Sequence, residues 1–257
     1  MKVSIPNSKL EKGIELGKVQ AKLLLDSSEI LCEKRKYVTS ISLAILAKEE
    51  LTKIRIFNKM LTKGLTIEND VWQILTDHRI KLSLPYYQAY ERLRRKSLPT
   101  LVKLQNAYKN EGIDLSFNII NLIKPINIEH LKFLQSLDLV KQDCQFLNWI
   151  NNDWYSILNN YNINLQKAVC YTIYYESLSD YLNLSLSLKY KRGDPIAIPK
   201  TITGNKLRKV LKYMQTDEFK KIRKFAYETI QRDYKERYED VLNNIIKRKR
   251  KTVNLPL

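Results

Sequence analysis

The chain has 257 residues, of which 45 are Lys or Arg and 27 are Asp or Glu, so its formal net charge is +18. With 44% hydrophobic residues it can bury a substantial core, which excludes an intrinsically disordered protein. Six glycines and seven prolines are few for a fold of many short strands, so the composition favours helices with short connections.

The cysteine count and the net charge narrow the class of protein further. Three cysteines and two histidines do not form a regular zinc pattern, so we expect a reduced cytoplasmic protein without a metal or other cofactor. No apolar run near the N-terminus is long enough to span a membrane. A positive field attracts polyanions such as RNA, DNA or acidic proteins, without selecting among them.

Apolar residues at helical spacing predict the first elements in chain order. A first helix is expected from Ser8, as N-cap, to about Glu33, and a second from about Lys36 to Lys63. A third carries His78 and is broken at Pro85. Further helical segments are then expected at 86–96, at 99–112, and within 115–147 on either side of Pro125.

The second half of the chain is also predicted to be mainly helical. Asparagines and aromatic residues in 141–160 predict a small hairpin with its turn at Asn151-Asn152 or Asn152-Asp153. An apolar helix follows at 165–188, and a last helix runs from about 216 to 249.

The charge distribution predicts an appended element. Residues 203–257 contain sixteen Lys or Arg and seven Asp or Glu, a net +9, which is half of the excess charge in about a fifth of the chain. We therefore predict an antiparallel helical domain over 1–192, a linker over 193–202 and a basic helical extension over 203–257.

Polar residues interrupt the apolar faces of the second and third predicted helices. Glu50 falls on such a face, and Lys53 follows it three residues later on the same side. His78 and Lys81 repeat this spacing on the next helix. If the two helices pack antiparallel, an acid, two amines and an imidazole meet in one groove.

Three interpretations of this cluster remain open from the residues alone. It can be a buried network that fixes the register of the helices. It can bind a phosphate or nucleotide. It can also be catalytic, with Glu50, Lys53, His78 and Lys81 as its residues and the imidazole as general acid or base in RNA cleavage.

Three motifs in sequence order resemble a known family. The first contains Ala44, Ala47, Glu49, Glu50 and Lys53, the second Trp72, His78 and Lys81, and the third Cys144, Phe146, Leu147, Asn148, Trp149 and Trp154. Together they resemble the AbiV family of bacterial abortive-infection proteins over about residues 10–160. More distantly they resemble the all-α HEPN superfamily. The resemblance implies a helical bundle, often a homodimer, that stops an infected cell before phage can mature.

The chain departs from the ribonucleases of the HEPN superfamily at one position. Their motif has an arginine separated from a histidine by four to six residues, whereas Val71, Trp72 and Gln73 occupy those positions before His78. Before His130 the equivalent residue is Lys124, which lacks the planar guanidinium fork. Arg79 or a partner subunit would have to supply the missing group.

Two basic surfaces are candidates for binding nucleic acid. The first interleaves tyrosines with Arg92, Arg94 and Arg95, a mixture that suits stacking on single-stranded RNA, a protein interface or a solvated face. The second is the run Lys247, Arg248, Lys249 and Arg250 near the end of the extension.

We therefore predict an all-α antiphage protein that disables RNA function or translation, with a metal-independent ribonuclease as one mechanism. Its expected partners are RNA or the translation machinery, a phage protein as activator and a second copy of the chain. The alternatives are a non-enzymatic dimer that binds a phage protein or the translation machinery, and a regulatory RNA-binding protein.

Overall fold

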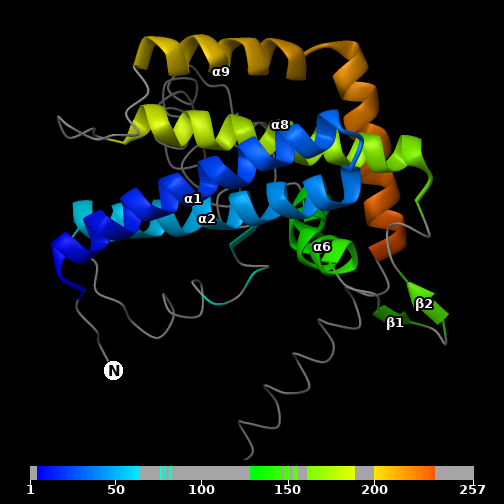
Figure 1. Ribbon diagram of the computed structural model, residues 1–257, viewed down its shortest axis with the longest axis horizontal. Helices are drawn as coiled ribbons and strands as arrows, with labels where there is room; N and C mark the ends of the chain where they lie inside the picture. Colours follow the sequence, from blue (N-terminus) through cyan, green and yellow to red (C-terminus); the bar gives the residue numbers. More distant parts are fainter. Residues whose placement is uncertain are drawn as a thin grey trace, which may run out of the picture.

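The computed structural model describes residues 5–63, 76, 78, 81–82, 128–145, 148–150, 153–155, 161–188 and 200–234. In these residues the chain forms a helical bundle with one small hairpin, as the composition predicts (Figure 1). The hairpin pairs β1 (Asn148–Ile150) with β2 (Asp153–Tyr155), and two residues connect the strands. This is the register that a turn at Asn151-Asn152 requires. No helix in the described ranges is both long and apolar enough to cross a membrane.

The bundle begins with two long antiparallel helices, α1 (Asn7–Glu33) and α2 (Tyr37–Lys63). The prediction that Ser8 caps α1 is wrong, because Pro6 is the N-cap and no side chain caps the helix. The turn between them places Arg35 at φ 59°, and the N–H groups of Arg35 and Lys36 donate to the last carbonyls of α1. This left-handed residue reverses the chain within three residues.

α2 is the central element of the first half of the bundle. It contacts α1, α6 (Ile128–Gln145) and α8 (Ile163–Ser187), so it is enclosed on most of its circumference. Its approach to α1 is close at Gly17, where an added Cβ would lie 2.8 Å from Ile54. α8 is likewise buried almost all round and is capped by the Asn162 side chain. Buried helices of this kind lack the polar face of a surface helix.

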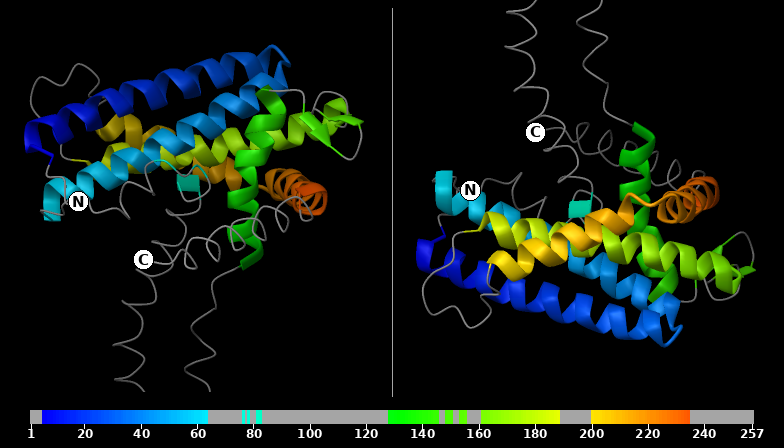
Figure 2. Two further views of the ribbon diagram at one scale, coloured as in Figure 1. Left: turned by 90° about the horizontal axis from the view of Figure 1, so that it is seen from below. Right: turned by 90° about the horizontal axis from the view of Figure 1, so that it is seen from above.

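Residues after 200 share this core. α9 (Lys200–Met214) packs along α8 and begins inside the stretch predicted as a linker (Figures 1 and 2). A further helix, residues 217–234, places Ile230 and Tyr234 in the main apolar cluster. The remainder of the predicted last helix, to 249, lies outside the described residues, as do the predicted helices at 86–96 and 99–112.

Polar contacts anchor the helix 217–234 as well. Its Tyr227 donates a hydrogen bond to the Glu176 carboxylate of α8, and its Arg223 lies 3.0 Å from the same group. Burial raises the pKa of Tyr227 well above its ordinary value, so the phenol keeps the proton that it donates. Tyr234 donates to Asp143 of α6 at 2.5 Å. The helix 217–234 is therefore fixed to both α8 and α6.

Candidate functional site

A buried carboxylate in the middle of α2 organises the candidate site. Glu49 is only 2% exposed. Its Oε2 lies 2.5 Å from His78 Nδ1 and 3.2 Å from Lys81 Nζ, and its Oε1 accepts a hydrogen bond from Lys141 Nζ at 2.6 Å. Three cationic or titratable groups therefore converge on one acid.

The participating residues come in pairs three residues apart, which places both members of a pair on one side of a helix. α2 contributes Glu49 and Thr52, and α6 contributes Asp138 and Lys141, whose side chains lie 2.9 Å apart. The described residues of the segment 76–82 are helical and contribute His78 and Lys81. The Thr52 hydroxyl donates to the Lys81 carbonyl at 2.8 Å, which fixes this segment against α2.

The charges in the site are balanced. Burial by itself would raise the pKa of Glu49, but the hydrogen bond and charge of Lys141, followed by those of His78, lower it below its ordinary value. Glu49 is therefore ionised at neutral pH. With Asp138 it balances the two buried ammonium groups of Lys81 and Lys141, so a protonated His78 leaves the cluster with one excess positive charge.

His78 is the member of the cluster that solvent reaches. Its side chain is 48% exposed, whereas those of Glu49, Lys81 and Lys141 are 3%, 4% and 7% exposed. An ionised carboxylate accepts only, so His78 Nδ1 carries a hydrogen and donates it to Glu49. The neutral ring then has its lone pair on Nε2, at the edge turned away from the buried acid. A carboxylate that orients an imidazole in this way is a known arrangement for a general base.

The binding of a metal ion is another function to consider for these residues. In the described part of the chain, Glu49, His78 and Asp138 have ligand atoms within 4.8 Å of one another. However, Lys141 Nζ already lies 2.6 Å from Glu49, 2.9 Å from Asp138 and 3.2 Å from His78. An ammonium ion thus takes the place of a metal cation, and Lys81 adds a second positive charge nearby. These residues do not fit a divalent cation while Lys141 is present.

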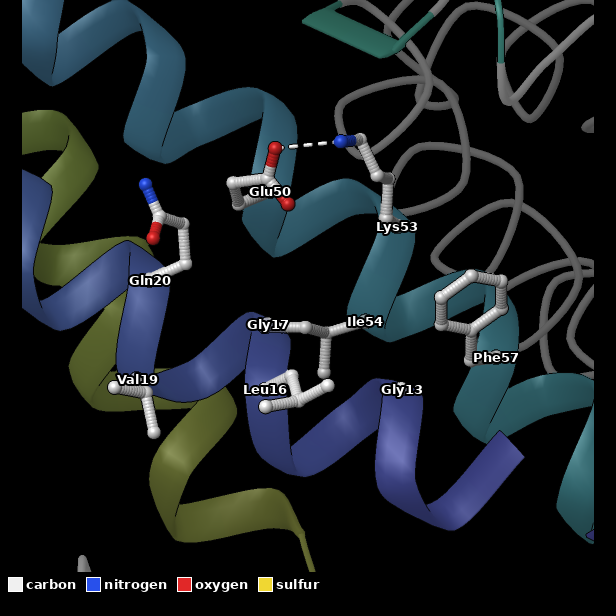
Figure 3. Close-up of a pocket in the computed structure, with 9 residues that line it drawn as sticks. All are labelled: Gly13, Leu16, Gly17, Val19, Gln20, Glu50, Lys53, Ile54 and Phe57. Atoms are coloured by element: carbon white, nitrogen blue, oxygen red, sulfur yellow. Dashed lines mark hydrogen bonds and ion pairs between the residues drawn. The ribbon is translucent and has the colours of Figure 1, made fainter. Parts of the chain in front are cut away.

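Glu50 and Lys53 lie in a different place from the cluster around Glu49. They form an ion pair of 2.5 Å at the rim of a groove between α1 and α2 (Figure 3). The groove has a volume of about 420 Å³, and its other lining residues include Gly13, Gly17 and Phe57.

The prediction that Glu50, Lys53, His78 and Lys81 meet in one groove is therefore correct only in part. The structure brings His78 and Lys81 together as predicted, but the acid that they contact is Glu49 and the second amine is Lys141. Adjacent helical residues point about 100° apart, so a one-residue error selects a different face. The candidate nucleic-acid residues Arg79, Arg92, Arg94, Arg95, Lys247, Arg248, Lys249 and Arg250 lie outside the described residues.

Sequence reasoning missed Asp138 and Lys141, although a signal was present. Asp138 interrupts the apolar stretch of α6 from Leu137 to Val140, Lys141 directly follows this stretch, and both are buried. Charged residues at such positions require partners, since an uncompensated buried charge costs several kcal/mol. The same test that selected Glu50 in α2 would have selected this pair.

Comparison with known families is consistent with this architecture. A family model described as AbiV, of the HEPN type, matches residues 9–159, which is more than half of the chain. The protein is thus a HEPN-type helical protein. It belongs to the AbiV family and is an abortive-infection protein, which confirms the resemblance of its three motifs. In the same comparisons no curated protein and no solved structure matched the chain.

Substituting the central acid tests the charge balance. Glu49→Gln leaves two ammonium groups buried without their carboxylate, so we expect the free energy of unfolding at pH 7 to fall by about 3–5 kcal/mol. Glu50→Gln, which removes the acid of a partly exposed pair, should cost less than about 1 kcal/mol. Urea denaturation of the two variants beside the wild type measures both values.

The pH dependence of the free energy of unfolding provides the control for this measurement. Because the folded protein lowers the pKa of Glu49, its stabilising effect is present above the unfolded value of about 4.3 and is lost as the pH falls through the folded value. The difference between wild type and Glu49→Gln should therefore shrink below about pH 4. A difference that stays constant with pH, or equal losses for both variants, would contradict the charge balance.

Proposed function

We propose that this protein is a toxin that disables RNA in infected cells and that His78 is its general base. The observation that supports this most directly is a half-exposed imidazole whose Nδ1 is hydrogen-bonded to the buried, ionised Glu49. This arrangement leaves Nε2 free to take a proton from a substrate. A charge of +18 favours a polyanionic substrate and speeds its encounter with the protein.

The chemistry proposed is cleavage of a phosphodiester by the neighbouring 2′-hydroxyl of RNA. His78 Nε2 takes the proton of that hydroxyl, whose oxygen attacks phosphorus, and the 5′ oxygen of the next nucleotide leaves. The leaving oxygen takes a proton from water, and the hydroxide that remains takes the proton back from His78. The products are a cyclic phosphate and a 5′-hydroxyl end. No metal is needed for this route, because the substrate contains its own nucleophile. General base catalysis contributes about 10²–10⁴-fold to such a step.

Lys81 and Lys141 support this reaction indirectly. Both are buried against Glu49, so they hold in place the acid that orients His78. Direct contact with RNA falls to other groups, for which Arg79, Arg92, Arg94, Arg95 and the basic run 247–250 are our candidates. If the toxin requires a phage protein for activation, it stays inactive before infection.

A second candidate function is a non-enzymatic dimer that acts by binding the translation machinery or a phage protein. One surface feature favours it. Leu16, Leu23 and Ile30 of α1 are 59%, 55% and 52% exposed, and they follow one another at seven-residue intervals. They form one apolar row along the helix, which lies at the outer edge of the bundle (Figure 2). A row of this spacing suits pairing with a helix of a second copy.

The total-RNA size profile of cells after induction tests the first proposal, with wild type beside His78→Ala and His130→Ala. We expect discrete fragments ending in 5′-hydroxyl groups with wild type, and none with His78→Ala at equal protein level and equal helix content. Fragments that persist with His78→Ala but vanish with His130→Ala would show that the catalytic histidine is His130 and not His78. Intact RNA with arrested growth in both wild type and His78→Ala would overturn the ribonuclease in favour of the binder.

The molar mass in solution tests the dimer. Leu23→Glu places a charge at the centre of the apolar row and should convert a dimer to a monomer in light scattering after gel filtration. Ile163→Glu changes an equally exposed apolar residue at the start of α8, outside the row, and should leave the mass unchanged. A wild type that is monomeric, or a dimer that survives Leu23→Glu, would refute this interface.

A further inference from the structure

Two cysteines that belong to neither proposal lie in contact at one end of the bundle. Cys32 is in the last turn of α1 and Cys170 is in α8, 138 residues further along the chain. Their Sγ atoms are 3.2 Å apart, and neither forms a disulfide in this structure. An S–S bond is about 2.05 Å long, so a displacement of about 1 Å separates the two thiols from bonding distance.

Polar neighbours hold the two thiols in this arrangement. The Cys170 thiol lies within hydrogen-bonding distance of both Cys32 Sγ and Ser40 Oγ, each at 3.2 Å. Ser40 in turn donates to the Ser28 carbonyl at 2.7 Å, and all of these residues are buried. α1, α2 and α8 therefore meet at a packed polar contact that keeps the two sulfur atoms adjacent.

The two cysteines differ in reactivity. Cys32 is 8% exposed, and Cys170 is fully buried. The hydrogen bond from Cys170 lowers the pKa of Cys32 below its ordinary value, although burial opposes this shift. The same contact and burial raise the pKa of Cys170 well above its ordinary value. Because the thiolate is the nucleophile, Cys32 is the group that an oxidant reaches and reacts with first.

We propose that Cys32 and Cys170 are a peroxide-sensitive pair that closes into a disulfide between α1 and α8. A hydroperoxide oxidises the Cys32 thiol to a sulfenic acid and is reduced to water or an alcohol. The Cys170 sulfur then attacks the sulfenic sulfur, an S–S bond forms, and water leaves with the Cys170 proton. For hydrogen peroxide, two thiols and one peroxide give one disulfide and two waters, a two-electron oxidation.

The cross-link acts on the stability of the bundle and not on the site itself. Ser40, which contacts Cys170, precedes Glu49 by nine residues of α2, a distance of about 13 Å along the helix. The disulfide closes a loop of more than a hundred residues, which restricts the unfolded chain strongly. For a protein of this size we expect the oxidised form to unfold about 5–10 °C higher than the reduced form.

Intact mass spectrometry of the folded full-length protein tests the proposal. After exposure to hydrogen peroxide and alkylation in denaturant, we expect a loss of two hydrogens and one alkylated cysteine, Cys144, in place of the three of the reduced protein. Cys144, on α6, is half-buried, forms no disulfide in this structure and serves as the control. Cys144→Ser should therefore cross-link and gain thermal stability as the wild type does.

Cys32→Ser should neither cross-link within the chain nor gain stability upon peroxide treatment. Since this change could disturb packing, Cys170→Ala is tested beside it, with helix content measured for both. Recovery of all three alkylated thiols after treatment would overturn the proposal. A disulfide that includes Cys144, or one formed only between chains, would overturn it equally.

Discussion

The ion cluster around Glu49 is the constraint on which the rest of the site depends. A carboxylate that is 2% exposed stays ionised only where cations compensate it, and here they come from the segment 76–82 and from α6. These two parts of the chain must therefore assemble around α2 before the acid is stable. The same assembly gives His78 its orientation, because the imidazole contacts the acid through Nδ1 and meets solvent with its other edge.

α2 also connects this site to the C-terminal half of the chain. Lys48, directly before Glu49, points to another side of the helix and lies 3.6 Å from Glu176 and 3.7 Å from Asp180 of α8. Glu176 is the group that Arg223 and Tyr227 contact from the helix 217–234. The same helix reaches α6 through Tyr234 and Asp143, two residues from Lys141. The first part of the basic extension is thus joined to α6, which contributes to the site, and to α8, which packs against α2.

The sequence was sufficient for elements whose signals are local. The approximate bounds of α2 and α8 follow from apolar spacing, and the two-residue hairpin turn follows from a pair of asparagines. The identity of the central acid did not follow, because α2 is buried on nearly every side and Glu49 and Glu50 both interrupt apolar surroundings. Lys141 lies 92 residues from Glu49. Only tertiary packing pairs two such residues. The predicted linker, 193–202, overlaps the first residues of α9, because Pro199 directly before Lys200 favours a break in the chain.

The neutral tautomer of His78 decides whether Glu49 orients this ring for proton transfer. Long-range ¹H–¹⁵N NMR spectra of the two histidines, assigned with a His78→Gln variant, show which ring nitrogen carries the hydrogen in the neutral form. We expect a hydrogen on Nδ1, shared with Glu49, and a bare Nε2. A hydrogen on Nε2 would contradict this expectation, because the imidazole would then have no hydrogen to donate to the buried acid and no free base to offer a substrate.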